Sequence, residues 1–364
     1  MTIRHDLYNE RERFILLLIY CHHNYCQDRH NFKITLKNCV KMLSVRVIFN
    51  PNQISRPTAI ALGNFDGVHV GHRHVIAPIL PIALHDHHQN LTSTVVSFSP
   101  HPQEFFSQKP RSLLTPFDEK VALLESLGVE QLVLLPFEAN LANLTAAEFI
   151  QKILIDSLQV ELISVGFDFH FGQKRQGNVT DLQDIWGDRL TIIPEQTMIF
   201  GDAKQSSVRI SSSNIRTALA QGEIELANSL LGRAYNFVGK VARGKQLGRT
   251  IGFPTANLEV FTQKCLPRDG VYAVEAIVNN SQKTLLGVMN IGLRPTVDDL
   301  RNDWRTIEVH LLDWHGDLYD QELSVNLIKF IRPEKKFDSL EALKTQIQTD
   351  CQAAIRTEQL STAA

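Results

Sequence analysis

The stretch "TAIALGNFDGVHVGHRHVIAPIL", residues 58 to 80, decides the fold of the first half of this chain. "TAIAL" is apolar and short, as a buried strand is, and "VHVGHRHVIAPIL" can start a helix. Between them lies a turn with Gly63 and Gly67. Glycines permit positive φ and a close approach of the backbone to a ligand, and a helix start offers free N–H groups. Strand, glycine turn and helix together predict a phosphate-binding element.

The turn leads into "HVGH", with His69 and His72 three residues apart. At this spacing both imidazoles point to one side of the first helical turn, where they could donate hydrogen bonds to a phosphate under attack. Two other interpretations stay open. With His74 the histidines are close enough for a zinc site, although no HExxH or CxxC accompanies them. The stretch could also be a tight turn with surface histidines.

Strand-like runs and amphipathic helices alternate from Val45 to about Leu231. A helix is expected over 117–128, ended by Gly128, and another begins at a Thr145 cap. This alternation predicts a Rossmann-like parallel sheet with helices on both faces, whose ligands lie at the carboxyl ends of the strands. The predicted strands are "VRVIF", "TAIAL", "TSTVVSF", "EQLVLLPF", "ELISVG" and "LTIIP".

From Phe237 to Ile331 strand-like runs follow one another with turns between them and no helical pattern. They predict an antiparallel β-barrel, closed by one helix that begins at an Asp338 cap. The expected fold is therefore α/β plus β. The expected domains are an α/β domain over 42–231 and a barrel domain over 232–364, with 1–41 as an N-terminal extension. We hypothesise that translation starts at Met42, just before the first strand.

Composition limits the partners. A chain of 364 residues is long enough for two domains. The net charge of -2 gives no general attraction to nucleic acid. The longest apolar run near the N-terminus, residues 14 to 20, is far shorter than the roughly 20 residues that cross a bilayer. The five cysteines show no disulfide framework. We expect a cytoplasmic monomer or weak homo-oligomer without nucleic-acid or membrane partners.

Three further motifs follow the first: "FSPHP" (98–102), "GFDFHFG" (166–172) and "ISSSNIR" (210–216). The last one is a serine-capped helix start with an arginine in its first turns, and both features favour an anion. An ordinary capped helix is the alternative. In order and spacing, the four motifs closely resemble the N-terminal half of bacterial bifunctional riboflavin kinase/FAD synthetases.

The resemblance implies transfer of AMP from ATP to FMN, with pyrophosphate released. By that analogy His69 and His72 bind the ATP phosphates and stabilise the transition state, with the phosphates held from the other side by Ser211, Ser212 and Arg216. The remaining ATP-binding residues that it implies are Gly63, Phe65, Asp66, Gly67 and Gly71. Phe98, Asp168, Phe169 and Phe171 would bind the flavin. Phe169 and Phe171 could equally be core residues under their loop.

The second half contains "GRTIGFPTANL" (248–258), which closely resembles the nucleotide and metal loop of riboflavin kinases. The resemblance implies that Gly248 and Thr255 bind ATP, that Thr255 and Asn257 coordinate Mg²⁺, and that Asn290 and Arg294 bind the flavin. It also implies that Glu308 is the base for the ribityl 5′-hydroxyl. From the residues alone, Glu308 could be a solvent-facing strand residue. Asp320 stands where the family usually has glycine, so that turn would be strained if it needs positive φ.

One nearby pattern is misleading. Residues 239–245 satisfy GxxxxGK, but Gln246 replaces the magnesium-binding Ser or Thr and the segment lies on a predicted strand, so no Walker A loop is expected.

The predicted function is phosphorylation of riboflavin to FMN and adenylylation of FMN to FAD, with ATP as second substrate and Mg²⁺ as cofactor. Two alternatives remain. One is an enzyme that has lost one activity, and the other is a flavin or nucleotide sensor without turnover. A sensor would be expected to lack Glu308 or the histidines, and all three are present.

Overall fold

The computed structural model describes residues 44–50, 53–84, 90–199, 207–244, 248, 251–279, 281, 283–293 and 305–362. Residues 1–41, Met42 and Arg294 lie outside this set. The chain forms two compact units. The first comprises residues up to Phe65, His72–Lys109 and Phe117–Pro194. The second comprises Asp66–Gly71, Pro110–Pro116 and Glu195–Ala364.

The first unit contains a parallel sheet of six strands in the order β1-β4-β3-β2-β5-β6, which confirms the predicted fold class. All of its neighbouring strands pair in parallel. Every residue of β2 is buried, as expected for a strand covered on both faces. The strands are β1 (Arg46–Ile48), β2 (Thr58–Leu62), β3 (Thr92–Ser99), β4 (Gln131–Pro136), β5 (Val160–Gly166) and β6 (Leu190–Ile193).

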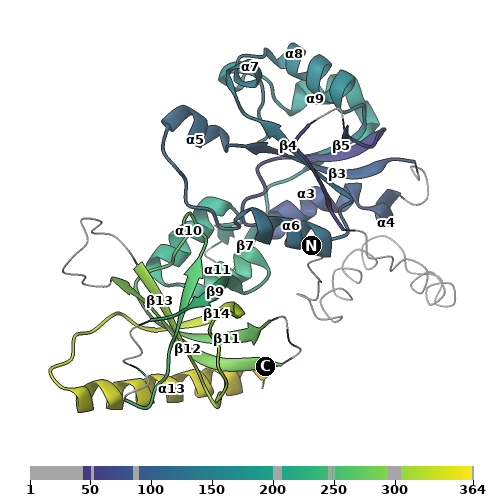
Figure 1. Cartoon of the computed structure of the whole chain (residues 1–364). Coiled ribbons are helices and arrows are strands. Elements are labelled where there is room, and N and C mark those ends of the chain that lie inside the picture. The colour runs from purple at the N-terminus through teal and green to yellow at the C-terminus, as the bar shows by residue number, and fades with distance from the viewer. Residues whose placement is uncertain are drawn as a thin grey trace. The chain divides into compact units, whose positions relative to one another are not determined.

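Helices cover both faces of this sheet (Figure 1). On one face lie α3 (Val70–Ile76), α4 (Pro81–Leu84) and α6 (Phe117–Ser126), and on the other α7 (Ala139–Ala142), α8 (Ala146–Glu148) and α9 (Val179–Trp186). The short helix α5 (Pro102–Ser107) follows β3.

Thr145 caps α8 as predicted, and Glu148 completes a capping box with it. Hydrogen bonds to the Thr145 backbone lower the pKa of Glu148 to about 2. The helix predicted to follow is α-helical only to Glu148 and continues as a π-helix over Phe149–Ser157. Phe149, Ile150 and Leu154 of that segment enter the core of the first unit.

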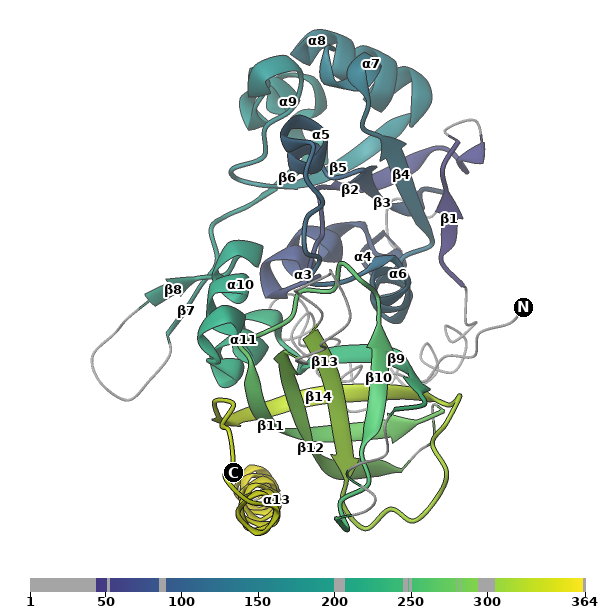
Figure 2. The same cartoon turned by 60° about the vertical axis from the view of Figure 1, so that its left-hand side comes forward.

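The second unit contains a closed barrel in the order β10-β13-β12-β11-β14-β9 (Figure 2), and all of its neighbouring strands pair antiparallel. The strands are β9 (Tyr235–Ala242), β10 (Ala256–Val260), β11 (Gly270–Val278), β12 (Thr284–Leu293), β13 (Arg305–Leu311) and β14 (Glu322–Arg332). This confirms the predicted barrel, although β10 was expected to be part of a loop. Four elements precede the barrel in the sequence. They are the antiparallel pair β7 (Thr197–Ile199) and β8 (Ser207–Arg209) and the helices α10 (Ser212–Gln221) and α11 (Ile224–Leu231).

The closing helix α13 (Leu340–Thr362) packs along β11, β12 and β14 (Figure 2). Its predicted cap was wrong by one residue, because Ser339 Oγ, not Asp338, accepts the Ala342 N–H at 3.1 Å. Asp320 adopts φ 61°, the positive value that the glycine of the family would permit. Its side chain pairs with Lys240 at 3.1 Å.

Candidate active sites

Three of the predicted motifs follow three adjacent strands of the parallel sheet. The turn from Gly63 follows β2, "FSPHP" includes the end of β3, and "GFDFHFG" follows β5, and β2 lies between the other two. The chain leaves β2 for β3 on one side and returns to β5 on the other, so this is the point where the strand order reverses. The carboxyl ends of strands at such a point form the usual ligand crevice of an open α/β sheet.

The turn after β2 is conformationally strained. Phe65, Gly67 and Val68 have φ of 49°, 95° and 39°. A positive φ in a β-branched residue such as Val68 is an outlier, and such values persist only where surrounding contacts enforce them. Within the first unit, Ser97 Oγ and Lys120 Nζ both donate to the Asn64 carbonyl at 3.1 Å. The contacts that fix the remainder of the turn lie in the second unit.

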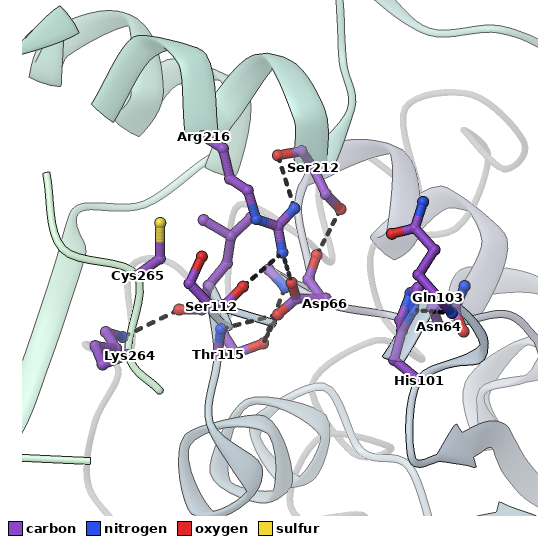
Figure 3. A network of polar contacts seen from close by, with 12 residues as sticks. Asn64, Asp66, His101, Gln103, Ser112, Thr115, Ser212, Arg216, Lys264 and Cys265 are labelled. Atoms are coloured by element: carbon purple, nitrogen blue, oxygen red, sulfur yellow. Dashed lines mark hydrogen bonds and ion pairs between the residues drawn. The ribbon is translucent and has the colours of Figure 1, made fainter. Parts of the chain in front are cut away.

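Asp66 is the centre of those contacts (Figure 3). Its side chain is 5% exposed and forms an ion pair with Arg216 of α10. Thr115 donates its N–H to Asp66 Oδ1 at 3.1 Å, and its hydroxyl accepts the Gly67 N–H at 2.9 Å. Ser212 Oγ donates to the Asp66 carbonyl at 2.7 Å. The structure thus brings Asp66, Gly67, Ser212 and Arg216 of two separate motifs together.

The start of α10 agrees with the sequence prediction. The Ser211 hydroxyl accepts the Asn214 N–H at 3.2 Å and caps the helix. Arg216, one turn further, also donates to the Ser112 carbonyl at 3.1 Å. An arginine beside the N-terminal end of a helix is a suitable place for a phosphate group.

The "HVGH" element lies at the start of α3. His69 is 5% exposed, and a Cβ on Gly71 would lie 3.3 Å from its ring and 3.8 Å from Ile210 Cγ2. The absence of a side chain at Gly71 therefore lets the start of α3 lie close to Ile210, the residue before Ser211. The His72 ring meets Phe65 edge-on at 5.3 Å between centroids. Among the described residues, no three His, Cys, Asp or Glu side chains gather as a metal site would require, so the zinc interpretation gains no support.

The aromatic loop after β5 gives its two phenylalanines different positions. Phe171 is 5% exposed and packs against Phe149, with ring centroids 5.3 Å apart. Phe169 stacks on Phe171 at 5.8 Å and lies at the edge of the core. Phe171 thus fits the alternative of a core residue. Phe98 also lies at the edge of this core and meets Phe137 edge-on at 5.7 Å. Asp168 lies directly before Phe169, and its carbonyl contacts His170 Nδ1 at 2.8 Å.

In the barrel, Glu308 lies in register with two asparagines. On β13 its neighbours are Asn257 of β10 and Asn290 of β12. Directly opposed residues of antiparallel strands project to the same face. Ile307 and Val309 are buried in the barrel core, so the partly exposed Glu308 faces away from it, as predicted. The three residues form a polar row on the outer face of the barrel.

Two glycines lie close to Thr255 and Asn257, the residues predicted to coordinate Mg²⁺. A Cβ on Gly248 would lie 3.3 Å from Thr255 Oγ1, and one on Gly244 would lie 2.1 Å from Asn257 Nδ2. Only glycine leaves room for Asn257 in its present position. On the same strand as Glu308, His310 Nδ1 donates to the Pro254 carbonyl at 2.8 Å, because that carbonyl can only accept.

A parallel sheet with a glycine turn where its strand order reverses, joined in one chain to a barrel with a polar row around Glu308, is typical of an enzyme with two nucleotide sites. The comparisons agree. Residues 51–214 match the family model described as FAD synthetase, and residues 231–357 match the one described as riboflavin kinase. The chain belongs to the family of bifunctional riboflavin kinase/FMN adenylyltransferases. It therefore phosphorylates riboflavin to FMN and adenylylates FMN to FAD.

Similar proteins match this chain over nearly the whole of their own length. The bifunctional riboflavin kinase/FMN adenylyltransferase of Escherichia coli strain K12 is 41% identical over 312 residues, covering 85% of this chain and 96% of that protein. The protein of the same name from Bacillus subtilis strain 168 is 38% identical and covers 82% of this chain and 92% of its own. A crystal structure described as a macrolide-efflux protein from Streptococcus pneumoniae superposes with a TM-score of 0.72 at 29% identity, covering 85% of this chain and 98% of that one.

Two residues that hold the segments around the turn, Thr115 and Lys264, were not predicted from the sequence. Lys264 is 4% exposed, and its Nζ donates to the Leu114 carbonyl at 3.0 Å (Figure 3). Beside it, burial raises the pKa of the Cys265 thiol, and the charges of Arg216 and Lys264 oppose that shift. Neither residue belongs to a motif, and their partners are distant in the sequence: Lys264 binds Leu114 across 150 positions, and Thr115 binds Asp66 across 49. Within the described residues, no helix is long and apolar enough to cross a membrane.

Proposed function

We propose that FMN adenylylation takes place at the strained turn after β2 and riboflavin phosphorylation at the Glu308 row of the barrel. The observation that carries the first assignment is that the turn, "FSPHP" and "GFDFHFG" follow three adjacent strands where the strand order reverses. The corresponding domains are 42–231 and 232–364. The family matches over 51–214 and 231–357 support this division.

In the proposed adenylyl transfer, an oxygen of the FMN phosphate attacks the α-phosphorus of ATP, and pyrophosphate leaves. No protein nucleophile is needed, so the chain contributes positioning and charge neutralisation. His69 and His72 donate to the ATP phosphates, while Arg216 and the N-terminal end of α10 with Ser211 and Ser212 attract them from the other side. The backbone of the turn approaches the nucleotide through Gly63, Phe65, Asp66, Gly67 and Gly71.

The geometry refines two of these roles. Both oxygens of the Asp66 carboxylate are occupied by Thr115 and Arg216. A carboxylate facing a phosphate would repel it, so we assign Asp66 to orienting Arg216 and the turn. For the flavin we propose Phe98, Asp168 and Phe169, with Phe171 as the ring beneath Phe169.

In the proposed phosphoryl transfer, the ribityl 5′-hydroxyl attacks the γ-phosphorus of ATP, Glu308 accepts the hydroxyl proton, and ADP leaves. A primary alcohol is a poor nucleophile, so a carboxylate positioned beside it accelerates the step. Asn290, in register with Glu308, is placed to orient the flavin substrate, and Gly248 and Thr255 to bind ATP. Arg294, predicted to bind flavin, lies outside the described residues.

The residues present fit a magnesium ion. Asn257, in register with Glu308, and Thr255, two residues before Asn257, supply uncharged oxygens, and two glycines leave the space that these side chains need. Mg²⁺ is commonly bound by few protein oxygens together with substrate phosphates. When bound, it would neutralise charge on the transferred phosphate. We further infer a cytoplasmic protein without nucleic-acid or membrane partners, which the net charge of -2 and the cysteine pattern support, and a monomer or weak homo-oligomer.

The experiment that tests the proposed function uses purified full-length protein with riboflavin, ATP and Mg²⁺, and separates the products by chromatography. FMN should appear first and FAD later. FMN without FAD, even when FMN and ATP are supplied, would contradict the adenylylation site. Absence of both products would contradict the function as a whole.

A further inference from the structure

The segment Ser112 to Thr115 connects three parts of the second unit that are distant in the sequence. Thr115 binds Asp66 and Gly67 of the strained turn, and the Ser112 carbonyl accepts from Arg216 of α10. Between them, Leu113 forms a parallel bridge with Lys264. The Leu113 N–H donates to the Gln263 carbonyl at 2.6 Å, and the Cys265 N–H donates to the Leu113 carbonyl at 2.8 Å. We call Ser112 to Thr115 the strap.

Lys264 fastens the middle of the strap. Its ammonium donates to the Leu114 carbonyl at 3.0 Å and lies 4.6 Å from the centroid of the Tyr235 ring and 5.5 Å from that of Phe237. The Tyr235 hydroxyl in turn donates to the Cys265 carbonyl at 2.6 Å. A charged hydrogen bond in a nearly dry site is stronger than a surface bond, and aromatic faces favour the cation. The barrel strand β9, which carries both rings, thereby fixes the strap.

The strap acts on the turn through Thr115. Its N–H donates to Asp66, and its hydroxyl accepts the N–H of Gly67. Gly67 lies directly before Val68, whose φ is 39°. A β-branched residue in this conformation is unfavourable, so neighbouring contacts must offset its strain. Leu114 is fully buried, and its Cδ1 lies 3.0 Å from where a Cβ on Gly67 would be. Strap and turn are therefore packed without spare room.

We propose that Thr115 and Lys264 are positioning residues for FMN adenylylation. Lys264, from the riboflavin kinase part of the sequence, fixes the strap. Thr115, which is part of the strap, then holds the backbone that binds ATP in place. This inference rests on the proposed location of adenylyl transfer at the turn. Neither residue is assigned a contact with the substrate. Both act through Asp66, Gly67 and Arg216, and one half of the chain thus supports the reaction assigned to the other.

The first test compares Thr115→Val with Thr115→Ser in the full-length protein, with FMN and ATP as substrates. Valine keeps the shape but lacks the hydroxyl that accepts from Gly67. We expect the KM for ATP in adenylylation to rise about tenfold in Thr115→Val and to stay within about twofold of wild type in Thr115→Ser. A merely structural role would reduce the amount of active enzyme, and hence kcat, without moving KM.

The second test compares Lys264→Met with Lys329→Met, which removes a half-exposed lysine of the same barrel. Only Lys264→Met should raise the KM for ATP in adenylylation, while the kinase reaction of the same samples reports an intact barrel. If Lys264→Met also loses kinase activity, the comparison of Thr115→Val with Thr115→Ser decides whether the strap positions the turn. An unchanged KM for ATP in Thr115→Val overturns the proposal.

His72→Ala separates this inference from the proposed function. If His72→Ala stops FAD formation while Thr115→Val and Lys264→Met have the KM of wild type, only the positioning role is overturned. If His72→Ala makes FAD at the normal rate, the site itself is misplaced and the inference falls with it.

Discussion

Gly67 is the residue at which the turn leaves least freedom. Its φ of 95° disfavours any side chain, and an added Cβ would also lie 3.0 Å from Leu114 Cδ1. Gly67→Ala should therefore lower the free energy of unfolding by more than the roughly 1–2 kcal/mol of the left-handed backbone alone. It should also slow FAD formation from FMN, measured by chromatography.

The matched control is Gly128→Ala, because Gly128 has φ 86° and no heavy atom within 4 Å of an added Cβ. Gly128→Ala should show only the backbone cost and normal FAD formation. Equal effects on FAD formation in the two variants would show that the turn has no special part in adenylylation.

Asn257 allows a test of the proposed metal site. Asn257→Ala removes an oxygen next to Glu308, so the Mg²⁺ concentration for half-maximal kinase activity should rise about tenfold. The Mg²⁺ dependence of FAD formation from FMN should not change. Titration of both reactions with Mg²⁺ measures this, and Asn326→Ala, in β14 of the same barrel, is the control. An unchanged kinase titration would remove Asn257 from the proposed ligands.

Single residues were predictable from the sequence where a motif carried them. Ser211 caps α10, and Glu308 faces away from the barrel core. Phe171 shows the limit, since alternation along a loop does not tell whether a ring meets a ligand or the core. Thr115 and Lys264 could not be predicted because their roles come from partners distant in the sequence.

At the scale of elements, α13 is docked on the barrel by apolar contacts of Cys351 and Ala354 and by one buried ion pair. Asp350, whose side chain is 3% exposed, accepts three hydrogen bonds of 2.8–3.1 Å from Arg332 at the end of β14. Asp350→Asn leaves the arginine without its counter-charge and should cost about 3 kcal/mol. Urea titration of kinase activity would show this as an earlier midpoint.

The exposed pair of Lys240 and Asp320 serves as the comparison. Asp320→Asn should change stability by about 0.5 kcal/mol or less, because water screens the pair and asparagine tolerates positive φ. If Asp350→Asn were equally mild, another contact would dominate the docking of α13.

The sequence predicted the elements with clear periodicity and missed those without it. All six strands of the parallel sheet were expected, as were five of the six barrel strands. β10 was taken for a loop because it follows the glycine-rich segment of the nucleotide motif. The π-helical hydrogen bonding of Phe149–Ser157 was missed because, over so short a segment, apolar residues four and five positions apart fit either kind of helix.

At the scale of the whole molecule, the two family regions do not match the two compact units. Asp66–Gly71 and Pro110–Pro116 belong to the unit that contains the barrel, yet lie within the FAD synthetase match. Hydrophobic periodicity cannot predict that these segments join the other unit, because it depends only on residues that are close in the sequence. The domain assignment of 42–231 and 232–364 therefore stays a proposal about function.

The central claim is that one chain performs consecutive reactions at two separate sites. The most direct measurement is chromatography of the products that His72→Ala and Glu308→Gln form from riboflavin, and from supplied FMN, with ATP and Mg²⁺. His72→Ala should accumulate FMN and make no FAD. Glu308→Gln should make almost no FMN, a loss of about 10²–10⁴-fold, yet convert supplied FMN to FAD at the rate of wild type. Loss of both reactions in either folded variant would contradict two separate sites.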